Sequence, residues 1–251
     1  MNIEFLSSFK IFENEGLKEL ILLKSQGFNN TNYLLLGTKD NYLVRVFGQK
    51  KDREFEFKVN KIAYKIGIAQ KPFLLDLANN LMISKFTKGE HRYNLSHLEL
   101  QNLAYSLGKL HNIKCTKNPY NMEDDYKKYS KKPIQYKLFQ TNLLFKKIAL
   151  TTKDYALCHH DLNPKNILFD KNSVKFIDWE YARVNDRYFD LASVIVEFDL
   201  NQRQKQIFLK TYFTCKEKYE HEKLDLYIKA YKVMCKLWFH EYLNKPKSTL
   251  D

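Results

Sequence analysis

The sequence predicts an α+β protein in which a small antiparallel sheet precedes a mainly helical remainder. Two strand–turn–strand patterns predict the sheet: residues 33–36 and 42–47 flank a polar turn, and residues 72–77 and 81–86 flank another. Short apolar runs bounded by such turns are typical of hairpins. The third observation is that apolar residues recur at helical spacing through most of the later chain.

Residues 51–66 are predicted to form the helix between the two hairpins, with Gly67 just after its C-terminus. Ser96 and Glu99 form a capping-box pattern that starts a second helix. Further helices are expected over residues 134–149 and in the last part of the chain, up to Tyr242. The apolar segment 17–23 has no assigned type, and residues 26–32 are expected to form a polar turn.

Composition indicates a folded protein with a substantial core. The chain has 251 residues, of which 44% are hydrophobic, and few glycines or prolines. No segment approaches the roughly 18 apolar residues of a membrane span, and we expect no signal peptide. Four cysteines without C-x-x-C spacing favour reduced thiols in a cytoplasm over a disulfide framework or zinc site.

The formal net charge of +13 raises the question of a nucleic-acid partner. The lysines are spread along the chain, and no nucleic-acid motif accompanies them. We therefore expect solvated lysine faces and no nucleic-acid partner.

The chemistry is concentrated in residues 156–180. An apolar run leads into His159-His160-Asp161, and Asn166 follows five residues after Asp161. A short apolar strand, a turn at residues 171–172 and a second strand up to Asp178 come next, so we expect Asp161, Asn166 and Asp178 at the edges of two paired strands. Transfer of a phosphoryl group from ATP requires an acid that orients the attacking hydroxyl, and an Asn and an Asp that hold Mg²⁺. Asp161 is the candidate for the first role, and Asn166 and Asp178 are the candidates for the second.

This segment resembles the aminoglycoside phosphotransferase and choline kinase group, which shares its H-x-D-x-x-x-x-N and I-D-W/F-E-Y patterns. The resemblance implies a bilobal protein-kinase-like fold with a nucleotide-binding lobe over residues 1–87 and a catalytic, acceptor-binding lobe over residues 88–251. It also implies ATP and Mg²⁺ as cofactors. Asp190, in a motif like the family's F-D-L-A, is expected to brace the catalytic loop.

The resemblance also assigns the nucleotide side. Arg45 matches the V-x-R-x-x-G strand of choline kinases and is expected to position phosphates, held by Glu56 of a D-R-x-x-E pattern. The remaining expected contacts with ATP are a phosphate turn and a hinge whose backbone reads adenine: Asn30, Thr31 and Asn32, then Ser84 and Phe86.

The acceptor implied by the resemblance is an amino alcohol, choline first or ethanolamine, as in LicA-type bacterial choline kinases. Aromatic faces and a nearby acid hold an ammonium group, so Trp179, Glu180, Tyr181 and Trp238 are the candidates. Core packing is the competing interpretation of Trp238. A thiamine, sugar or aminoglycoside kinase stays open, although few acids in the C-terminal half argue against an aminoglycoside.

A protein kinase is disfavoured, because Asp178-Trp179-Glu180 stands in place of D-F-G and no A-P-E segment follows. Two other classes remain as alternatives: an inactive nucleotide-binding module and a basic nucleic-acid binder. Intact Asp161, Asn166 and Asp178 argue against the inactive module. A monomer or a homodimer without stable membrane insertion is expected.

Overall fold

The computed structural model describes residues 1–24, 30–129, 139–171, 173–214 and 219–243. The chain divides into two compact units. Unit 1 comprises Met1–Arg92 and Lys165–Tyr181, and unit 2 comprises Tyr93–Pro164 and Ala182–Asp251. The sequence suggested one boundary, after residue 87. In the structure, the first boundary between the units follows Arg92, and a later segment, Lys165–Tyr181, also belongs to unit 1.

Unit 1 is built on a five-stranded antiparallel sheet with the strand order β1-β2-β3-β5-β4. The strands are β1 (Leu17–Leu22), β2 (Asn30–Gly37), β3 (Asn41–Phe47), β4 (Pro72–Asp76) and β5 (Leu81–Lys85). Both predicted hairpins are present, and the unassigned segment 17–23 supplies the edge strand β1. The expected polar turn ends earlier than predicted, because residues 30–32 pair with the end of β3 and so belong to β2.

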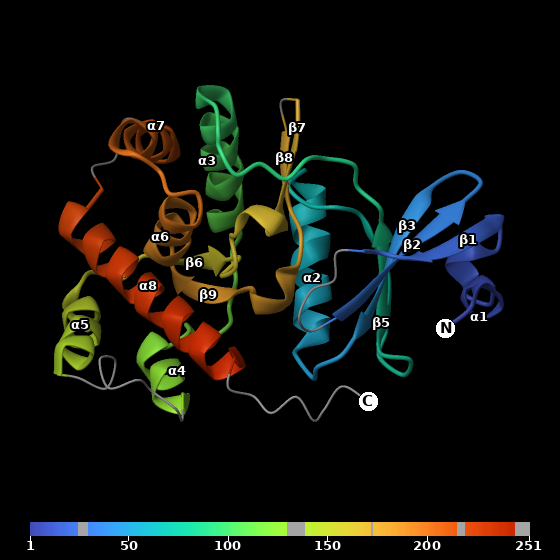
Figure 1. The fold of residues 1–251 in the computed structure, drawn as a ribbon, viewed down its shortest axis with the longest axis horizontal. Coiled ribbons are helices and arrows are strands. Elements are labelled where there is room, and N and C mark those ends of the chain that lie inside the picture. The colour runs from blue at the N-terminus through green and yellow to red at the C-terminus, as the bar shows by residue number, and fades with distance from the viewer. Residues whose placement is uncertain (25–29, 130–138, 172, 215–218, 244–251) are drawn as a thin grey trace. The chain divides into compact units, whose positions relative to one another are not determined.

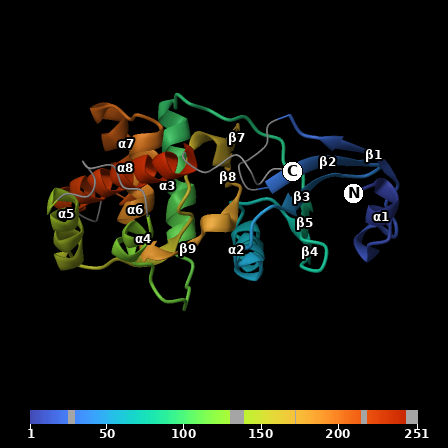
Figure 2. The ribbon, with the colours of Figure 1, turned by 60° about the horizontal axis from the view of Figure 1, so that its bottom comes forward.

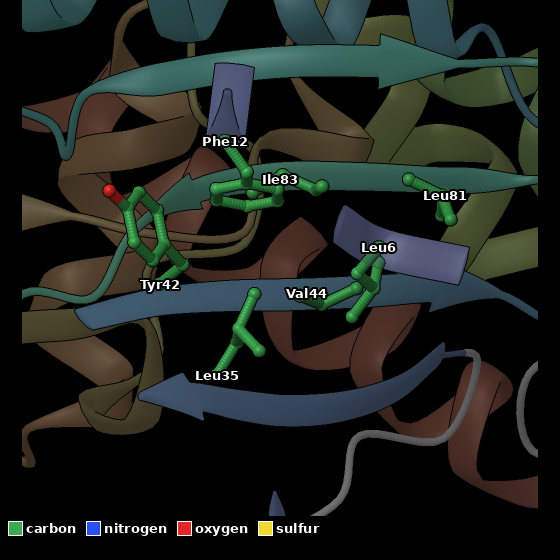
Figure 3. Packing of buried hydrophobic residues seen from close by; sticks show 7 residues of the cluster. All are labelled: Leu6, Phe12, Leu35, Tyr42, Val44, Leu81 and Ile83. Carbon is green, nitrogen blue, oxygen red and sulfur yellow. The ribbon is translucent and has the colours of Figure 1, made fainter. Parts of the chain in front are cut away.

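One face of this sheet carries a core that α1 (Ile3–Ser7) and the 3-10 turn Lys10–Phe12 cover. Figure 3 shows Leu6 and Phe12 from these segments packed among side chains of β2, β3 and β5. Tyr42 and Val44 of β3 point into this core. Since alternate residues of a strand face opposite sides, Arg45 is directed to the other face.

The other face is the side of α2 (Arg53–Lys65), and Figure 1 shows α2 and α1 on opposite sides of the sheet. The helix starts at Arg53 because the Asp52 side chain accepts a hydrogen bond from the Phe55 N–H. It ends before Gly67, whose φ of +82° is the left-handed conformation that glycine adopts readily. Val59 and Ala63 are buried on its apolar stripe.

The returning segment of unit 1 forms the predicted hairpin of β7 (Ile167–Asp170) and β8 (Ser173–Phe176). Two isolated bridges, Glu90 with Phe169 and Ala69 with Phe176, join this hairpin to the first part of the unit. A 3-10 turn, Trp179–Tyr181, follows β8. These contacts explain why Lys165–Tyr181 belongs to unit 1 although it lies far along the chain.

Unit 2 is mainly helical, as predicted. Its helices are α3 (His97–His111), α4 (Met122–Lys128), α5 (Phe139–Leu150), α6 (Tyr188–Glu197), α7 (Gln202–Tyr212) and α8 (His221–Leu243). The capping box predicted at Ser96 and Glu99 is present at the start of α3. Residues 134–138 of the helix expected over 134–149 lie outside the described residues.

Within unit 2, α3 packs against α7, and α6 packs against the long α8, as Figures 1 and 2 show. Two short strands, β6 (Tyr155–Cys158) and β9 (Arg183–Asp186), form an antiparallel pair beside them. β6 leads directly into the segment that contains Asp161. Of the helices in the described part of the chain, none is both long and apolar enough to cross a membrane.

Candidate active site

Arg45 is the centre of a charged cluster in unit 1. Its Nη1 lies 2.8 Å from Asp178 Oδ1 and 3.2 Å from Glu56 Oε1, and its Nε donates to Asn32 Oδ1 at 3.3 Å. Burial acts to lower the pKa of Arg45, but the nearby carboxylates, Asp178 first, outweigh it and raise that pKa. Arg45 is therefore a permanently charged group. It contacts both Glu56 and Asp178, the two acids that were expected on the nucleotide side.

Glu56 joins Arg45 to a second arginine. Its Oε1 contacts Arg45, and its Oε2 accepts a hydrogen bond from Arg53 Nη1 at 2.7 Å. The Glu56 side chain is 2% exposed, and this burial raises the pKa of its carboxyl, against the opposing effect of Arg45 and Arg53. The predicted pairing of Arg45 with Glu56 is present, whereas Glu54, two residues earlier on α2, is exposed.

Glu180 is held from three directions. Its Oε2 accepts from Asn30 Nδ2 at 2.9 Å and lies 3.1 Å from Arg53 Nη1, and its Oε1 lies 2.7 Å from Lys51 Nζ. Its side chain is 4% exposed. Buried carboxylates require this compensation, because burying an unpaired one costs on the order of several kcal/mol. The site role predicted for Glu180, binding of the acceptor, stays a prediction.

The residues expected to form a phosphate turn lie on β2. Asn30 and Asn32 are two residues apart and therefore share a face of the strand. Asn30 Oδ1 accepts from Arg53 Nη2 at 3.2 Å, and Asn32 accepts from Arg45. Thr31 is exposed on the alternate side. Both asparagines thus position arginine side chains, and contact of the three residues with phosphate stays a prediction.

The candidate metal ligands flank the β7–β8 hairpin. Asn166 is buried and precedes β7, Asp178 follows β8, and the Ile177 N–H donates to the Asn166 carbonyl at 2.9 Å. Asp178 has a φ of +66°, a strained conformation for a residue other than glycine. A carboxylate and an amide oxygen are the hard ligands that Mg²⁺ prefers. Asp178 is one-quarter exposed, and its Oδ1 contacts Arg45. The carboxylate of Asp178 and the amide oxygen of Asn166 are therefore a donor set that fits Mg²⁺.

Asp161 lies in unit 2, in the loop after β6, and does not flank the β7–β8 pair as the sequence suggested. Its Oδ1 accepts a hydrogen bond from Asn163 Nδ2 at 3.0 Å, and its backbone N–H donates to His159 Nδ1 at 3.3 Å. The side chain is half-buried. A carboxylate fixed in this way can accept a proton from a hydroxyl brought to it.

Asp190 braces this loop, as the resemblance implied. It accepts hydrogen bonds from the backbone N–H groups of His159 at 2.7 Å and His160 at 3.0 Å, and its Oδ2 lies 3.2 Å from His111 Nε2. Complete burial acts to raise the pKa of Asp190, but the hydrogen bond and charge of His111 lead the effects that lower it. Asp190 therefore stays ionised and orders the backbone before Asp161.

His160 adds a second restraint on the loop. Its φ is +71°, and its ring stacks on Phe189 with centroids 3.9 Å apart. Burial first, and the charge of Arg183 second, lower the pKa of His160 well below its usual range. The neutral ring lies 3.0 Å from Asn185 Nδ2, and the edge of Tyr120 packs against it.

The aromatic candidates for acceptor binding differ in exposure. Trp179 is 2% exposed and packs edge-on against Phe176, with centroids 6.1 Å apart. Tyr181 is half-buried, and Lys51 Nζ lies 3.5 Å from its ring centroid. Trp238, on α8 of unit 2, is half-buried and packs edge-on against Phe239. The structure gives Trp179 a packing role, and the acceptor role of all three stays a prediction.

The expected hinge residues end strand β5. Ser84 is 1% exposed inside the sheet, and the Phe86 N–H donates to the Asn41 carbonyl at 2.8 Å. These contacts belong to the sheet itself. Recognition of adenine by the backbone here stays a prediction.

Sequence reasoning did not single out Lys51 and Arg53 as members of the site. Arg53 appeared only within the D-R-x-x-E pattern, although its position three residues before Glu56 on a helix predicts a contact between the two. No local signal predicts the contact of Lys51 with Glu180, because the two are far apart in the sequence.

Comparison with known proteins identifies the family of this chain. The model of the phosphotransferase enzyme family matches residues 22–227. Protein LicA of Haemophilus influenzae is 26% identical over 236 residues, which cover 85% of this chain and 70% of that protein.

Two solved structures show the protein-kinase-like fold that the sequence predicted. Choline kinase LicA from Streptococcus pneumoniae matches with a TM-score of 0.77 and 23% identity, over 97% of this chain and 92% of that one. The crystal structure of LicA in complex with AMP matches with a TM-score of 0.72 and 24% identity, over 97% and 89% of the two chains. The fold, the catalytic loop and the family match lead to one conclusion: the chain belongs to the phosphotransferase enzyme family.

Proposed function

We propose that this enzyme transfers a phosphoryl group from ATP, with Mg²⁺, to the hydroxyl of an amino alcohol, choline first or ethanolamine. The observation that carries the proposal is the placement of Arg45 between Glu56 and Asp178 in unit 1. A buried cation beside a metal-binding carboxylate is the combination that phosphate oxygens require. The similarity to LicA, whose structure with AMP is known, supports a nucleotide as the donor.

The residues of unit 1 would bind and orient the donor. Arg45 would hold phosphate oxygens, with Glu56 and Asn32 fixing the direction of its guanidinium. Asn166 and Asp178 would hold Mg²⁺, which when bound neutralises charge on the phosphates. Asn30, Thr31, Ser84 and Phe86 are retained as candidate contacts with ATP.

The residues of unit 2 would act on the acceptor. Asp161 would accept a hydrogen bond from the substrate hydroxyl at its carboxylate and receive the proton as the phosphoryl group is transferred. Asn163 donates a hydrogen bond to that carboxylate, and His159 and Asp190 fix the backbone that carries it, before substrate arrives. Such preorganisation removes the cost of ordering the loop during the reaction.

An aromatic face of α8 with a carboxylate beside it supports an ammonium acceptor. Burial raises the pKa of Cys235 to about 12, and the charges of Glu197 and Asp161 add to this effect. Tyr231, Cys235 and Trp238 are spaced at i, i+4 and i+7 and therefore share one helix face. Tyr231 Oη donates to Glu197 Oε1 at 2.8 Å, which adds a carboxylate beside the aromatic groups.

A screen of acceptors tests the proposal. ADP release is measured with choline, ethanolamine, thiamine, an aminosugar and an aminoglycoside, each with ATP and Mg²⁺. We expect the highest kcat/KM with choline or ethanolamine, and loss of turnover when EDTA removes the metal. Turnover with none of them, or a higher kcat/KM with the aminoglycoside, would overturn the proposal. A cytoplasmic enzyme, monomeric or homodimeric, belongs to the same proposal.

A further inference from the structure

Lys51 contacts two groups, the Glu180 carboxylate and the Tyr181 ring, that together could bind an ammonium group. Its Nζ lies 2.7 Å from Glu180 Oε1 and 3.5 Å from the centroid of the Tyr181 ring. A carboxylate together with an aromatic face attracts a cationic nitrogen by charge and by the ring quadrupole. Both groups are candidates for binding the acceptor cation, and a cation of the chain itself already fills them.

We infer that Lys51 is a specificity-determining residue, an internal alkylammonium that a cationic acceptor must displace in order to use Glu180 and Tyr181. This inference rests on the proposed function for the identity of the acceptor. It concerns groups of unit 1 alone.

Lys51 contacts a different oxygen of Glu180 from the one that Asn30 and Arg53 contact. Oε2 interacts with Asn30 and Arg53, whereas Oε1 interacts with Lys51. When Lys51 moves away, Arg53 still compensates the buried charge at 3.1 Å. Glu180 would therefore keep its position and present Oε1 to another cation.

Lys51 also has a place to go. It lines a surface pocket formed by residues 47–54, Leu77 and Asn80. The Lys51 side chain is 16% exposed, compared with 4% for Glu180. The Nζ atom itself is buried. A lysine has a long flexible stem and a strongly hydrated ammonium group, so we expect it to exchange between Glu180 and this pocket by rotation of its side-chain bonds.

A tethered lysine competes with an acceptor at high effective concentration, of the order of millimolar for short tethers. A weakly held acceptor cation therefore binds more weakly while Lys51 is present. Removal of the lysine charge should strengthen binding of simple cations at Glu180 and Tyr181, and should lower KM for a cationic acceptor more than it changes kcat.

The test compares Lys51→Met with Lys50→Met. Methionine keeps most of the length of the side chain and removes its charge, and Lys50 is the exposed neighbour, so both variants change the net charge equally. Binding of tetramethylammonium and of methylammonium is measured by titration calorimetry at fixed ionic strength. We expect at least about fivefold tighter binding of one cation or both in Lys51→Met, and affinity close to that of the wild type in Lys50→Met.

Unchanged or weaker binding in Lys51→Met, or equal tightening in both variants, would overturn the inference. A raised KM for ATP in Lys51→Met with unchanged cation binding would do so too, because it would assign Lys51 to the phosphates. The two proposals fail separately. If the wild type phosphorylates no amino alcohol, the proposed function is wrong, whereas the comparison of cation binding still decides the role of Lys51.

Discussion

The two units hold their functional groups in physically different ways. In unit 1, three cations and three carboxylates compensate one another in a single cluster: Arg45, Lys51 and Arg53 with Glu56, Asp178 and Glu180. In unit 2, one buried acid, Asp190, orders the loop that precedes Asp161 by accepting hydrogen bonds from two backbone N–H groups. His160 is neutral there.

This difference teaches which contacts a substrate can replace. Ion pairs can exchange partners, so the proposed binding of phosphate to Arg45 and of metal to Asp178 would replace their mutual contact without loss of compensation. Hydrogen bonds from the backbone to Asp190 fix the geometry of the chain and have no equivalent in a ligand. We therefore expect unit 1 to respond to ligands and unit 2 to be set by folding alone.

Substitution of Asp190, which orders the loop before Asp161, should have the largest effect on stability. Asp190→Ala removes the acceptor of the backbone N–H groups of His159, which is buried, and His160, which is half-buried. Such a loss costs about 2–4 kcal/mol, and the displaced loop should also lower kcat. The free energy of unfolding in urea measures the first effect, and turnover measures the second.

Asp225→Ala is the matched control, since that side chain is 62% exposed on α8 and should change the unfolding free energy by about 0.5 kcal/mol or less. Equal stability of the Asp190 and Asp225 variants would show that the loop does not depend on Asp190.

The two buried acids should impose opposite dependences on pH. The pKa of Glu56 is raised above its ordinary value near 4.5, so the folded state binds its proton more tightly, and stability falls as the pH rises from that value towards the raised pKa. The pKa of Asp190 is lowered below its ordinary value near 3.8, so its stabilisation is present above that value and is lost as the pH falls through the lowered pKa.

Urea unfolding of the wild type, Glu56→Gln and Asp190→Asn from about pH 3 to about pH 7 measures these dependences. Relative to the wild type, Glu56→Gln should gain stability as the pH rises. The deficit of Asp190→Asn should shrink as the pH falls below about 3.8. If the difference in unfolding free energy from the wild type changed with pH in the same direction for both variants, the opposite dependences predicted for the two acids would be contradicted.

Exposed ion pairs should have the smallest effect and so mark the lower limit of the comparison. Lys127 Nζ lies 3.1 Å from Glu123 Oε1 on α4, and its side chain is 63% exposed. Lys127→Ala should change the unfolding free energy by about 0.5 kcal/mol or less. A loss as large as that of a buried pair would mean that burial does not separate strong charge contacts from weak ones here.

The local patterns of the sequence were sufficient for most elements of the fold. Both hairpins of the sheet, the helix after residue 51, and the capping box at Ser96 follow from turn chemistry, periodicity and side-chain caps. The loop motif singled out Asp161, Asn166 and Asp178 as candidates because their spacing is local, and their roles stay a prediction. The pairing of Arg45 with Glu56 came from resemblance to relatives.

Contacts between distant segments could not be predicted in this way. The return of Lys165–Tyr181 to unit 1 depends on bridges made by Ala69 and Glu90. The burial of Glu180 depends on Asn30, Lys51 and Arg53 together. Each partner alone looks like an ordinary surface residue. Periodicity and turn signals are local, so they do not predict a contact between residues more than about one hundred positions apart in the sequence.

The central claim is that Asp161 receives the proton of an acceptor hydroxyl while unit 1 binds the donor. Turnover of Asp161→Asn with ATP, Mg²⁺ and the best amino alcohol tests it most directly, with Asp170→Asn, an exposed acid at the end of β7, as the control. We predict that kcat falls by at least about a hundredfold in Asp161→Asn, with KM for ATP and thermal unfolding close to the wild type, and that Asp170→Asn keeps full turnover. A kcat of Asp161→Asn within a few-fold of the control would contradict the account.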